Sequence, residues 1–163
     1  MSITREAYRD GMARLAAAVN VITTDGPAGR GGFTASAVCS VTDAPPTLLV
    51  CLHLSSRQND FLRGNGVLCV NTLAAGQSQI ATLFSTRDLT MDQRFAVGEW
   101  LTMATGAPVL EGAQVAFDCR IVERLERGTH AIIICQVEQV RMGDHPDALV
   151  YYGRGYRRLG QKD

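Results

Sequence analysis

The chain has 163 residues, 46% of them hydrophobic, and its 16 Lys and Arg residues balance 16 Asp and Glu residues. This length fits one domain with a sizeable core, which we take as residues 1–163. The balanced charge provides no long-range field that would attract nucleic acid or an anionic membrane surface, so we expect a small molecule or another protein as the partner.

The first predicted elements are one helix and two strands. Apolar residues at helical spacing predict an amphipathic helix over residues 4–18, beginning at Thr4. "VNVITT" predicts a strand, and the turn residues "DGPAGRGG" connect it to a second strand, "FTASAVCSV". The glycines of that turn could suggest a dinucleotide-binding loop, but their spacing is wrong and a strand follows where that motif demands a helix.

The middle of the chain predicts further strands with short helices between them. "TLLVCLHL" is apolar on both faces and predicts a buried strand, "SSRQNDFLRGNG" a turn into a short helix, and "VLCVNTL" another strand. Short helices or ordered loops are expected at "SQIATLFS" and around "MDQRFAVGEW", with Phe95 and Trp100 in the core.

The last third returns to strands joined by hairpins. These are "VAFDCRIVERLE", "HAIIICQVEQVRM", "ALVYYG" and "GYRRLG". About seven or eight strands against three or four short helices predict a mainly β fold, an antiparallel barrel with appended helices, because no alternation of strands and helices indicates a parallel sheet.

Cysteine usage and the termini indicate the compartment. The five cysteines are odd in number, contain no C-x-x-C pair and lie in apolar runs, so we expect reduced, packed thiols and no metal site. They are Cys39, Cys51, Cys69, Cys119 and Cys135. Neither a signal peptide nor a stretch of roughly 20 apolar residues is apparent, so we expect a cytoplasmic protein.

The predicted strand at residues 32–42 is unusual because it is rich in small, hydroxyl-bearing residues. Thr34, Ser36 and Ser40 could offer hydroxyls and amides to a flat heteroaromatic ligand such as a flavin, while the small residues between them leave room. The alternative is a close sheet contact that needs small side chains for packing alone.

A second polar stretch follows two strands later. Ser55, Ser56 and Arg57 stand at a strand end just before a predicted helix, where exposed amides, two hydroxyls and a guanidinium suit an anion such as a phosphate. The alternative is a serine helix cap beside a solvated arginine. The motifs of metalloproteases, nucleophile-elbow hydrolases and P-loop proteins are all absent.

Several ordered segments together resemble the flavin reductase family with the FMN-binding split-barrel fold. They are "AAVNVITTDGPAG", "GFTASAVCSVTDAPPTLLVCL", "LCVNTLAAGQ", "RFAVGEW", "ATGAPVLEGA", "AFDCRI" and "GTHAIIICQVEQV". The chain is similar above all to the reductase components of two-component flavin-dependent monooxygenases, such as those of the 4-hydroxyphenylacetate and pyrimidine oxygenases. The resemblance implies a homodimer with a Greek-key-like split barrel that reduces FMN, or alternatively FAD, with NADH for a separate oxygenase component.

The resemblance also implies roles for individual residues. It places the ring of the flavin along Thr34, Ala35, Ser36, Ala37, Val38 and Cys39, with Ser36 or its neighbouring amides near flavin N5. It places Ser55, Ser56 and Arg57 near the ribityl phosphate, and His130 beside the nicotinamide with Tyr152 and Tyr156. Ser36 and His130 are thus the candidate catalytic residues. The chain departs from its relatives at His53, where they tend to have asparagine, and in the variable loop "STRDLTMDQ".

Three functions are compatible with the sequence. The first is an NADH-dependent flavin reductase, the second a non-enzymatic flavin or haem binder, and the third a reductase of another acceptor such as a cobalt corrin or a ferric chelate. No arginine cluster for the 2′-phosphate of NADPH is apparent, and the choice between NADH and NADPH stays open.

Overall fold

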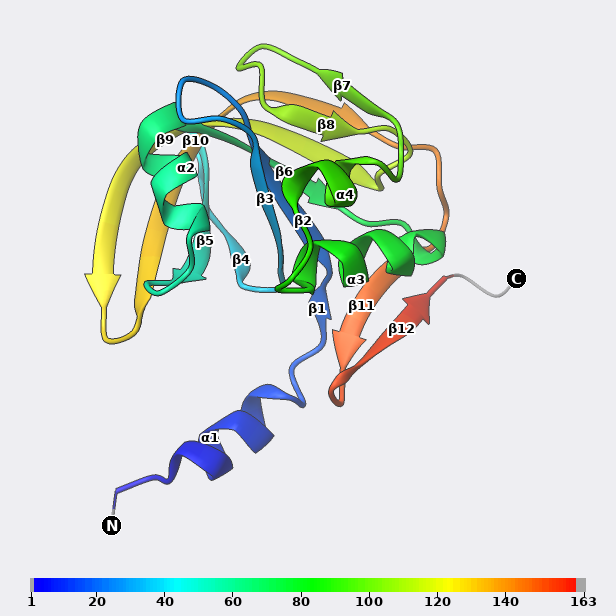
Figure 1. Ribbon diagram of the computed structural model, residues 1–163. Coiled ribbons are helices and arrows are strands. Elements are labelled where there is room, and N and C mark those ends of the chain that lie inside the picture. The colour runs from blue at the N-terminus through cyan, green and yellow to red at the C-terminus, as the bar shows by residue number, and fades with distance from the viewer. Residues whose placement is uncertain (1, 161–163) are drawn as a thin grey trace.

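The computed structural model describes residues 2–160, and a curled antiparallel sheet with short helices against it dominates the molecule (Figure 1). The sheet has seven strands in the order β3 (Gly31–Ala35), β2 (Asn20–Thr24), β6 (Val67–Thr72), β9 (Val115–Arg127), β10 (His130–Met142), β5 (Pro46–His53) and β4 (Val38–Asp43). All neighbouring strands in it are antiparallel. The prediction of a mainly β, antiparallel fold is confirmed.

The connection between β3 and β4 gives the sheet its split-barrel form. These strands stand at opposite edges of the sheet, yet only Ser36 and Ala37 join them. Because consecutive Cα atoms are about 3.8 Å apart, the facing ends of β3 and β4 lie within about 11 Å of each other. The sheet must therefore curl until its two edges almost meet. Within the described chain no strand pairing joins β3 to β4, so the barrel remains split at this point.

The single strand predicted over "FTASAVCSV" was wrong, since the chain turns at Ser36 and Ala37 and places the two halves on opposite edges. Each half is a regular strand by itself, so the residue pattern shows no break. The prediction for "TLLVCLHL" was also wrong in part. Leu48, Val50 and Leu52 are buried, but Leu49 and Cys51 on the other face of β5 remain partly exposed.

Buried side chains fill both faces of the central strands. In β2, Ile22 belongs to the cluster inside the barrel, whereas Val21 packs in a second cluster with Phe84 and Phe95. Successive side chains of a strand point to opposite faces, so β2 separates these two clusters. The second cluster joins the sheet to α3 (Ser78–Ser85) and α4 (Met91–Phe95), whose positions agree with the predicted short helices. The predicted helix after "SSR" is α2 (Gln58–Asn65), and a short 3-10 turn, Ala75–Gln77, precedes α3.

The N-terminal helix is shorter than predicted. It spans Arg5–Met12 as α1, with Thr4 as its N-cap accepting a hydrogen bond from the Ala7 amide at 3.1 Å. The residues that follow leave the helix and form β1 (Ala17–Ala18), which pairs with β11 (Ala148–Tyr152) in a separate sheet with β12 (Gly155–Leu159). Long-range strand pairing thus overrides helical periodicity here. α1 extends away from the barrel (Figure 1), and none of its residues is buried.

A small hairpin was missed by the sequence reasoning. It consists of β7 (Trp100–Thr102) and β8 (Pro108–Leu110), each only three residues long, and Pro108 opens β8, where a strand tolerates proline. The cysteine prediction holds for Cys69, Cys119 and Cys135, which are buried, but was wrong for Cys39, which is exposed on the edge strand β4. None of the helices in residues 2–160 is long and apolar enough to span a membrane.

Candidate functional site

A cavity of about 750 Å³ lies where β3, the turn between β5 and α2, and the segment from α3 to α4 meet. Its wall includes Thr34 on β3 and Ser55, Ser56 and Arg57 before α2. Thr34 of the first polar stretch and all three residues of the second therefore line one cavity, although about twenty residues separate them. Its volume lies within the range of about 300–1,000 Å³ that is usual for small-molecule sites.

Two amide side chains of α2 fix the turn that carries Ser55 and Ser56. Gln58 Oε1 accepts a hydrogen bond from the Gly32 amide at 2.8 Å, which ties α2 to the edge of β3. Asn59 is buried, and its Nδ2 donates to the carbonyls of His53, Leu54 and Ser56 at 2.9, 3.2 and 2.8 Å. The turn is thus held by its own helix and does not depend on a ligand for its shape.

Arg94 of α4 holds the opposite wall. It is only 7% exposed and donates to the carbonyls of Gly32, Phe84, Thr86 and Leu89 at 3.3, 2.8, 2.7 and 3.3 Å. Burial lowers the pKa of this guanidinium from its ordinary value, because removal from water disfavours the charged form. One buried cation therefore joins α4 to β3 and to the end of α3.

The charges around the cavity favour an anion. Arg57, Arg87 and Arg94 line it, and Asp88 is the one acidic side chain among its lining residues. In residues 2–160 neither Arg57 nor Arg87 forms an ion pair with a protein carboxylate. The Arg57 side chain also makes no capping bond to α2, so its donors are available to a ligand.

The edge of β3 offers backbone groups to the same region. The amide of Gly32 donates to Gln58 and its carbonyl accepts from Arg94, so the backbone groups of Gly32 point away from β2. Because backbone groups alternate in direction along a strand, the amide and carbonyl of Thr34 also point away from β2. No other residue in the described chain donates to or accepts from these two groups. The Thr34 hydroxyl is not available, because it donates to the Ala81 carbonyl at 2.6 Å.

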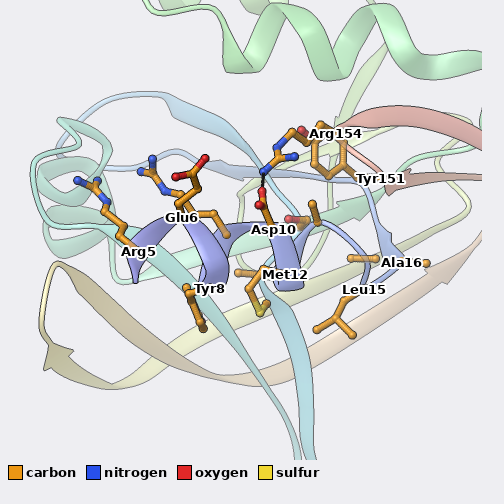
Figure 2. Close-up of a pocket in the computed structure, with 14 residues that line it drawn as sticks. Arg5, Glu6, Tyr8, Asp10, Met12, Leu15, Ala16, Tyr151 and Arg154 are labelled. Carbon is orange, nitrogen blue, oxygen red and sulfur yellow. Dashed lines mark hydrogen bonds and ion pairs between the residues drawn. The ribbon is translucent and has the colours of Figure 1, made fainter. Parts of the chain in front are cut away.

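Ser36 and Ala37 face a different hollow. This groove, about 1130 Å³ in volume, lies between α1, the link from β3 to β4 and the turn from β11 to β12 (Figure 2). Asp10 and Arg154 form an ion pair across it. The exposed Ser36 thus lies next to the cavity that Thr34 lines, on the side toward α1.

The remaining residues of the predicted ring-binding strip differ in burial. Ala35 and Val38 are partly buried against the barrel core, so their side chains serve packing. Cys39 is exposed, and its thiol lies 3.2 Å from the Ser40 carbonyl. What the strip has in common is small side chains on a backbone that turns from one edge of the sheet to the other.

His130 lies opposite His53 on the paired strands β10 and β5, and the two rings meet edge to face with centroids 5.0 Å apart. Nδ1 of His130 contacts the Thr129 hydroxyl at 2.9 Å, and Nδ1 of His53 contacts the Ser55 hydroxyl at 2.8 Å. His53 lines the cavity, so this pair connects the cavity wall to His130.

The two tyrosines predicted beside His130 are not near it in the single chain. Tyr152 and Tyr156 belong to β11 and β12, on the opposite side of the view from the β9–β10 turn that carries His130 (Figure 1). Tyr152 is exposed, and Tyr156 packs against the cluster beneath α3.

Sequence reasoning missed the part of the wall between α3 and α4. Arg87, Asp88 and Arg94 line the cavity, but they lie in or beside the loop "STRDLTMDQ", to which the sequence reasoning assigned no role. A usable signal existed: two arginines and two aspartates lie within the eight residues 87–94, directly after the predicted helix "SQIATLFS". In residues 2–160 no group of three or more His, Cys, Asp or Glu side chains could hold a metal ion.

Comparison with known proteins gives one consistent result. The family model described as "Flavin reductase like domain" matches residues 12–160. The chain is 57% identical over 158 residues to "FMN reductase (NADH) RutF" of Ancylobacter novellus, covering 97% of this chain and 87% of that protein. It is also 57% identical to the protein of the same name from Stutzerimonas stutzeri, covering 96% and 90%. Among solved structures, BorF, the flavin reductase component of a bacterial two-component tryptophan halogenase, superposes with a TM-score of 0.90 at 30% identity, covering 98% of this chain and 100% of that chain.

Proposed function

The chain belongs to the flavin reductase family, and we propose that it reduces FMN with NADH and supplies the reduced flavin to a separate oxygenase component. The observation that carries the proposal is the single cavity in which the open edge of β3 faces Ser55, Ser56 and Arg57. Relatives with more than half of their residues identical are named for this activity. FAD is a second candidate flavin.

The cavity fits a flavin nucleotide in chemistry as well as in volume. The outward backbone groups of Thr34, continued by the small residues Ala35 to Cys39, suit the polar edge and flat face of a flavin ring. Two hydroxyls and the guanidiniums of Arg57 and Arg87 suit a phosphate. We assign the ring to the first group and the phosphate to the second.

The chain's contribution to the reaction is alignment and electrostatics. When both are bound, the nicotinamide supplies a hydride and the flavin accepts it, so no strong acid or base of the protein is required. Holding two reactants at about 3 to 3.5 Å makes the step effectively unimolecular and contributes about 7–11 kcal/mol. Backbone amides near Ser36 would stabilise negative charge on the reduced ring, and we assign Ser36 this role.

We assign His130 to the nicotinamide side of the site. Its ring is exposed at the end of β10 and adjoins the cavity through His53. Tyr152 and Tyr156 belong to this pocket only if a second chain brings them there. The assignment of these tyrosines therefore depends on a homodimer.

A homodimer is supported by exposed apolar surface that a single chain leaves uncovered. Tyr8 and Met12 of α1 and Leu15 just after it are 58%, 47% and 61% exposed, on the side opposite Asp10 (Figure 2). An isolated helix of eight residues is only marginally stable, so such a stripe gains from a partner surface. Further exposed apolar side chains lie on the sheet, including Val140 and Met142 of β10. A matched pair of such surfaces on two copies would form a two-fold interface.

The homodimer has a direct test. We expect light scattering coupled to gel filtration to give twice the mass of the 17.6 kDa chain, and Leu15→Glu to shift the protein toward the monomer. A monomeric mass for the unaltered protein at all concentrations would refute the dimer.

The same proposal includes one flavin reductase domain over residues 1–163 and a cytoplasmic location. Support for the single domain is that the family match runs through almost the entire chain. Support for the location is that all five cysteines are free thiols, as is usual in a reducing compartment.

The activity is tested by steady-state oxidation of NADH with FMN, FAD, riboflavin or no flavin. We expect turnover that requires a flavin and is most efficient with FMN. A protein that binds FMN but shows no flavin-dependent NADH oxidation would be a binder, and the proposed reaction would be wrong. In this assay dissolved oxygen reoxidises the reduced flavin. Repeating it without oxygen, with a ferric chelate or a cobalt corrin added, shows whether the protein also reduces those acceptors.

A further inference from the structure

The ring of His53 is held in one tautomer by its neighbour. The backbone amide of Ser55 donates to Nδ1 of His53 at 3.2 Å, and the Ser55 hydroxyl lies 2.8 Å from the same atom. A backbone amide is a donor only, so Nδ1 must carry a lone pair. In a neutral imidazole the proton is then on Nε2. The turn after β5 therefore makes His53 an Nε2–H donor.

No acceptor for this donor is present in the part of the chain that the structure describes. Within residues 2–160, hydrogen bonds to the His53 ring involve Nδ1 alone. The ring lines the same cavity as Arg57, Arg87 and Arg94, so its available N–H adds to a set of cationic donors. The Ser55 amide already donates to Nδ1, so Nε2 is the ring nitrogen left to donate into the cavity.

We propose that His53 is a specificity-determining residue that recognises a phosphate monoester in this cavity through its Nε2–H group. This inference rests on the proposed function and deepens it. A terminal phosphate monoester presents three oxygens and close to two negative charges, and can accept from several donors at once. Ser55, Ser56 and Arg57 lie on one stretch of chain, and His53 adds a donor from the end of the β5 strand. Riboflavin lacks the phosphate and would gain nothing from this group.

The test combines a change at His53 with removal of the phosphate from the ligand: the affinities of each His53 variant for FMN and for riboflavin are compared. The variant His53→Asn keeps an acceptor for the Ser55 amide, because the amide oxygen of asparagine can take the place of Nδ1, but it removes the donor at Nε2. The variant His53→Gln places an amide N–H near the position of Nε2. FMN and riboflavin affinities are measured by quenching of flavin fluorescence without NADH, so the readout does not depend on turnover.

We expect His53→Asn to weaken FMN binding by about tenfold or more, which is the usual effect of losing a hydrogen bond to a charged group. Riboflavin affinity should change less than about twofold, and His53→Gln should retain most of the FMN affinity. Equal losses for FMN and riboflavin would overturn the inference, as would unchanged FMN affinity in His53→Asn. A glutamine variant as weak as the asparagine variant would assign the effect to ring shape and also overturn it.

The test separates this inference from the proposed reaction. If the unaltered protein binds FMN but does not oxidise NADH, the proposed reaction is wrong while the comparison of His53 variants still gives its answer. If NADH oxidation proceeds and the comparison shows no selective loss for FMN, the reaction stands and the role of His53 is wrong.

Discussion

Replacing Arg94 with methionine is expected to lower the free energy of unfolding by about 3 kcal/mol. Methionine has a similar length but no donors, so the carbonyls of Gly32 and Phe84 would lose their bonds to this side chain in a buried place. A buried polar group left without its partner costs about 1–3 kcal/mol. The carbonyls of Thr86 and Leu89 are only partly buried and can turn to water, so they add little. Relief of the burial cost of the guanidinium, whose pKa is lowered by burial, offsets part of the loss.

The loss is measured by urea denaturation of both proteins. A slope of about 1–3 kcal/mol per molar urea converts a loss of 3 kcal/mol into a fall of the midpoint by about 1–3 M. The matched control is Arg30→Met. Arg30 also contacts α4, the helix of Arg94: it pairs with Asp92 at 3.2 Å and lies 4.4 Å from the centre of the Phe95 ring. Its side chain, however, is 40% exposed. An exposed contact of this kind contributes about 1 kcal/mol or less. Equal midpoints for the two variants would refute the reasoning that the buried carbonyl bonds of Arg94 stabilise the fold.

Three further predictions follow from the site and its supports. His130→Ala should lower the rate of flavin reduction in rapid mixing with NADH while FMN affinity stays unchanged, and an unaltered rate would remove His130 from the nicotinamide side. Ellman's reagent should modify the exposed Cys39 quickly but not Cys135, because burial raises the pKa of the Cys135 thiol to about 12. The variant Cys39→Ser should abolish this fast reaction. Bound FMN should slow the reaction of Cys39 if the flavin ring covers this strand. Gly32→Ala should lower the melting temperature by several degrees, because its Cβ would stand 2.6 Å from the ring of Phe84 and 3.2 Å from the Ile22 carbonyl; an unchanged melting temperature would contradict that packing.

Strands and helices with strong local patterns were predictable from the sequence. Alternating residues and a Gly-containing turn identified β9 and β10, and the short helix α2 was identified by its turn and its glycine ending at Gly66, which adopts φ +68°. The N-terminal helix was overextended because residues 13–18 also match helical spacing. Their structure is decided by pairing of β1 with β11, more than a hundred residues away, and no local pattern reports such a partner.

The cavity was predictable only in parts. Thr34 and the Ser55–Arg57 stretch could be selected by residue type, and the structure brings them to one wall. Their functional groups could not be assigned in the same way. The Thr34 hydroxyl is used by the Ala81 carbonyl, and it is the strand backbone that remains open. Whether the Thr34 hydroxyl is free depends on Ala81 of α3, which lies 47 residues later in the chain, so only the tertiary structure decides it.

The link at Ser36 and Ala37 explains why small residues gather at this place in the chain. A curled sheet in which strands from opposite edges are joined by two residues brings its edges together without pairing them, so backbone groups stay open there. Large side chains at the link would fill the gap that the unpaired edges leave. If the gap receives a flat ring, small residues and open backbone groups are two consequences of one topological feature. Packing alone would favour larger side chains that close the gap, because an unfilled void forfeits dispersion contacts and hydrophobic burial. The composition of this strip therefore favours a ligand over a purely structural sheet contact.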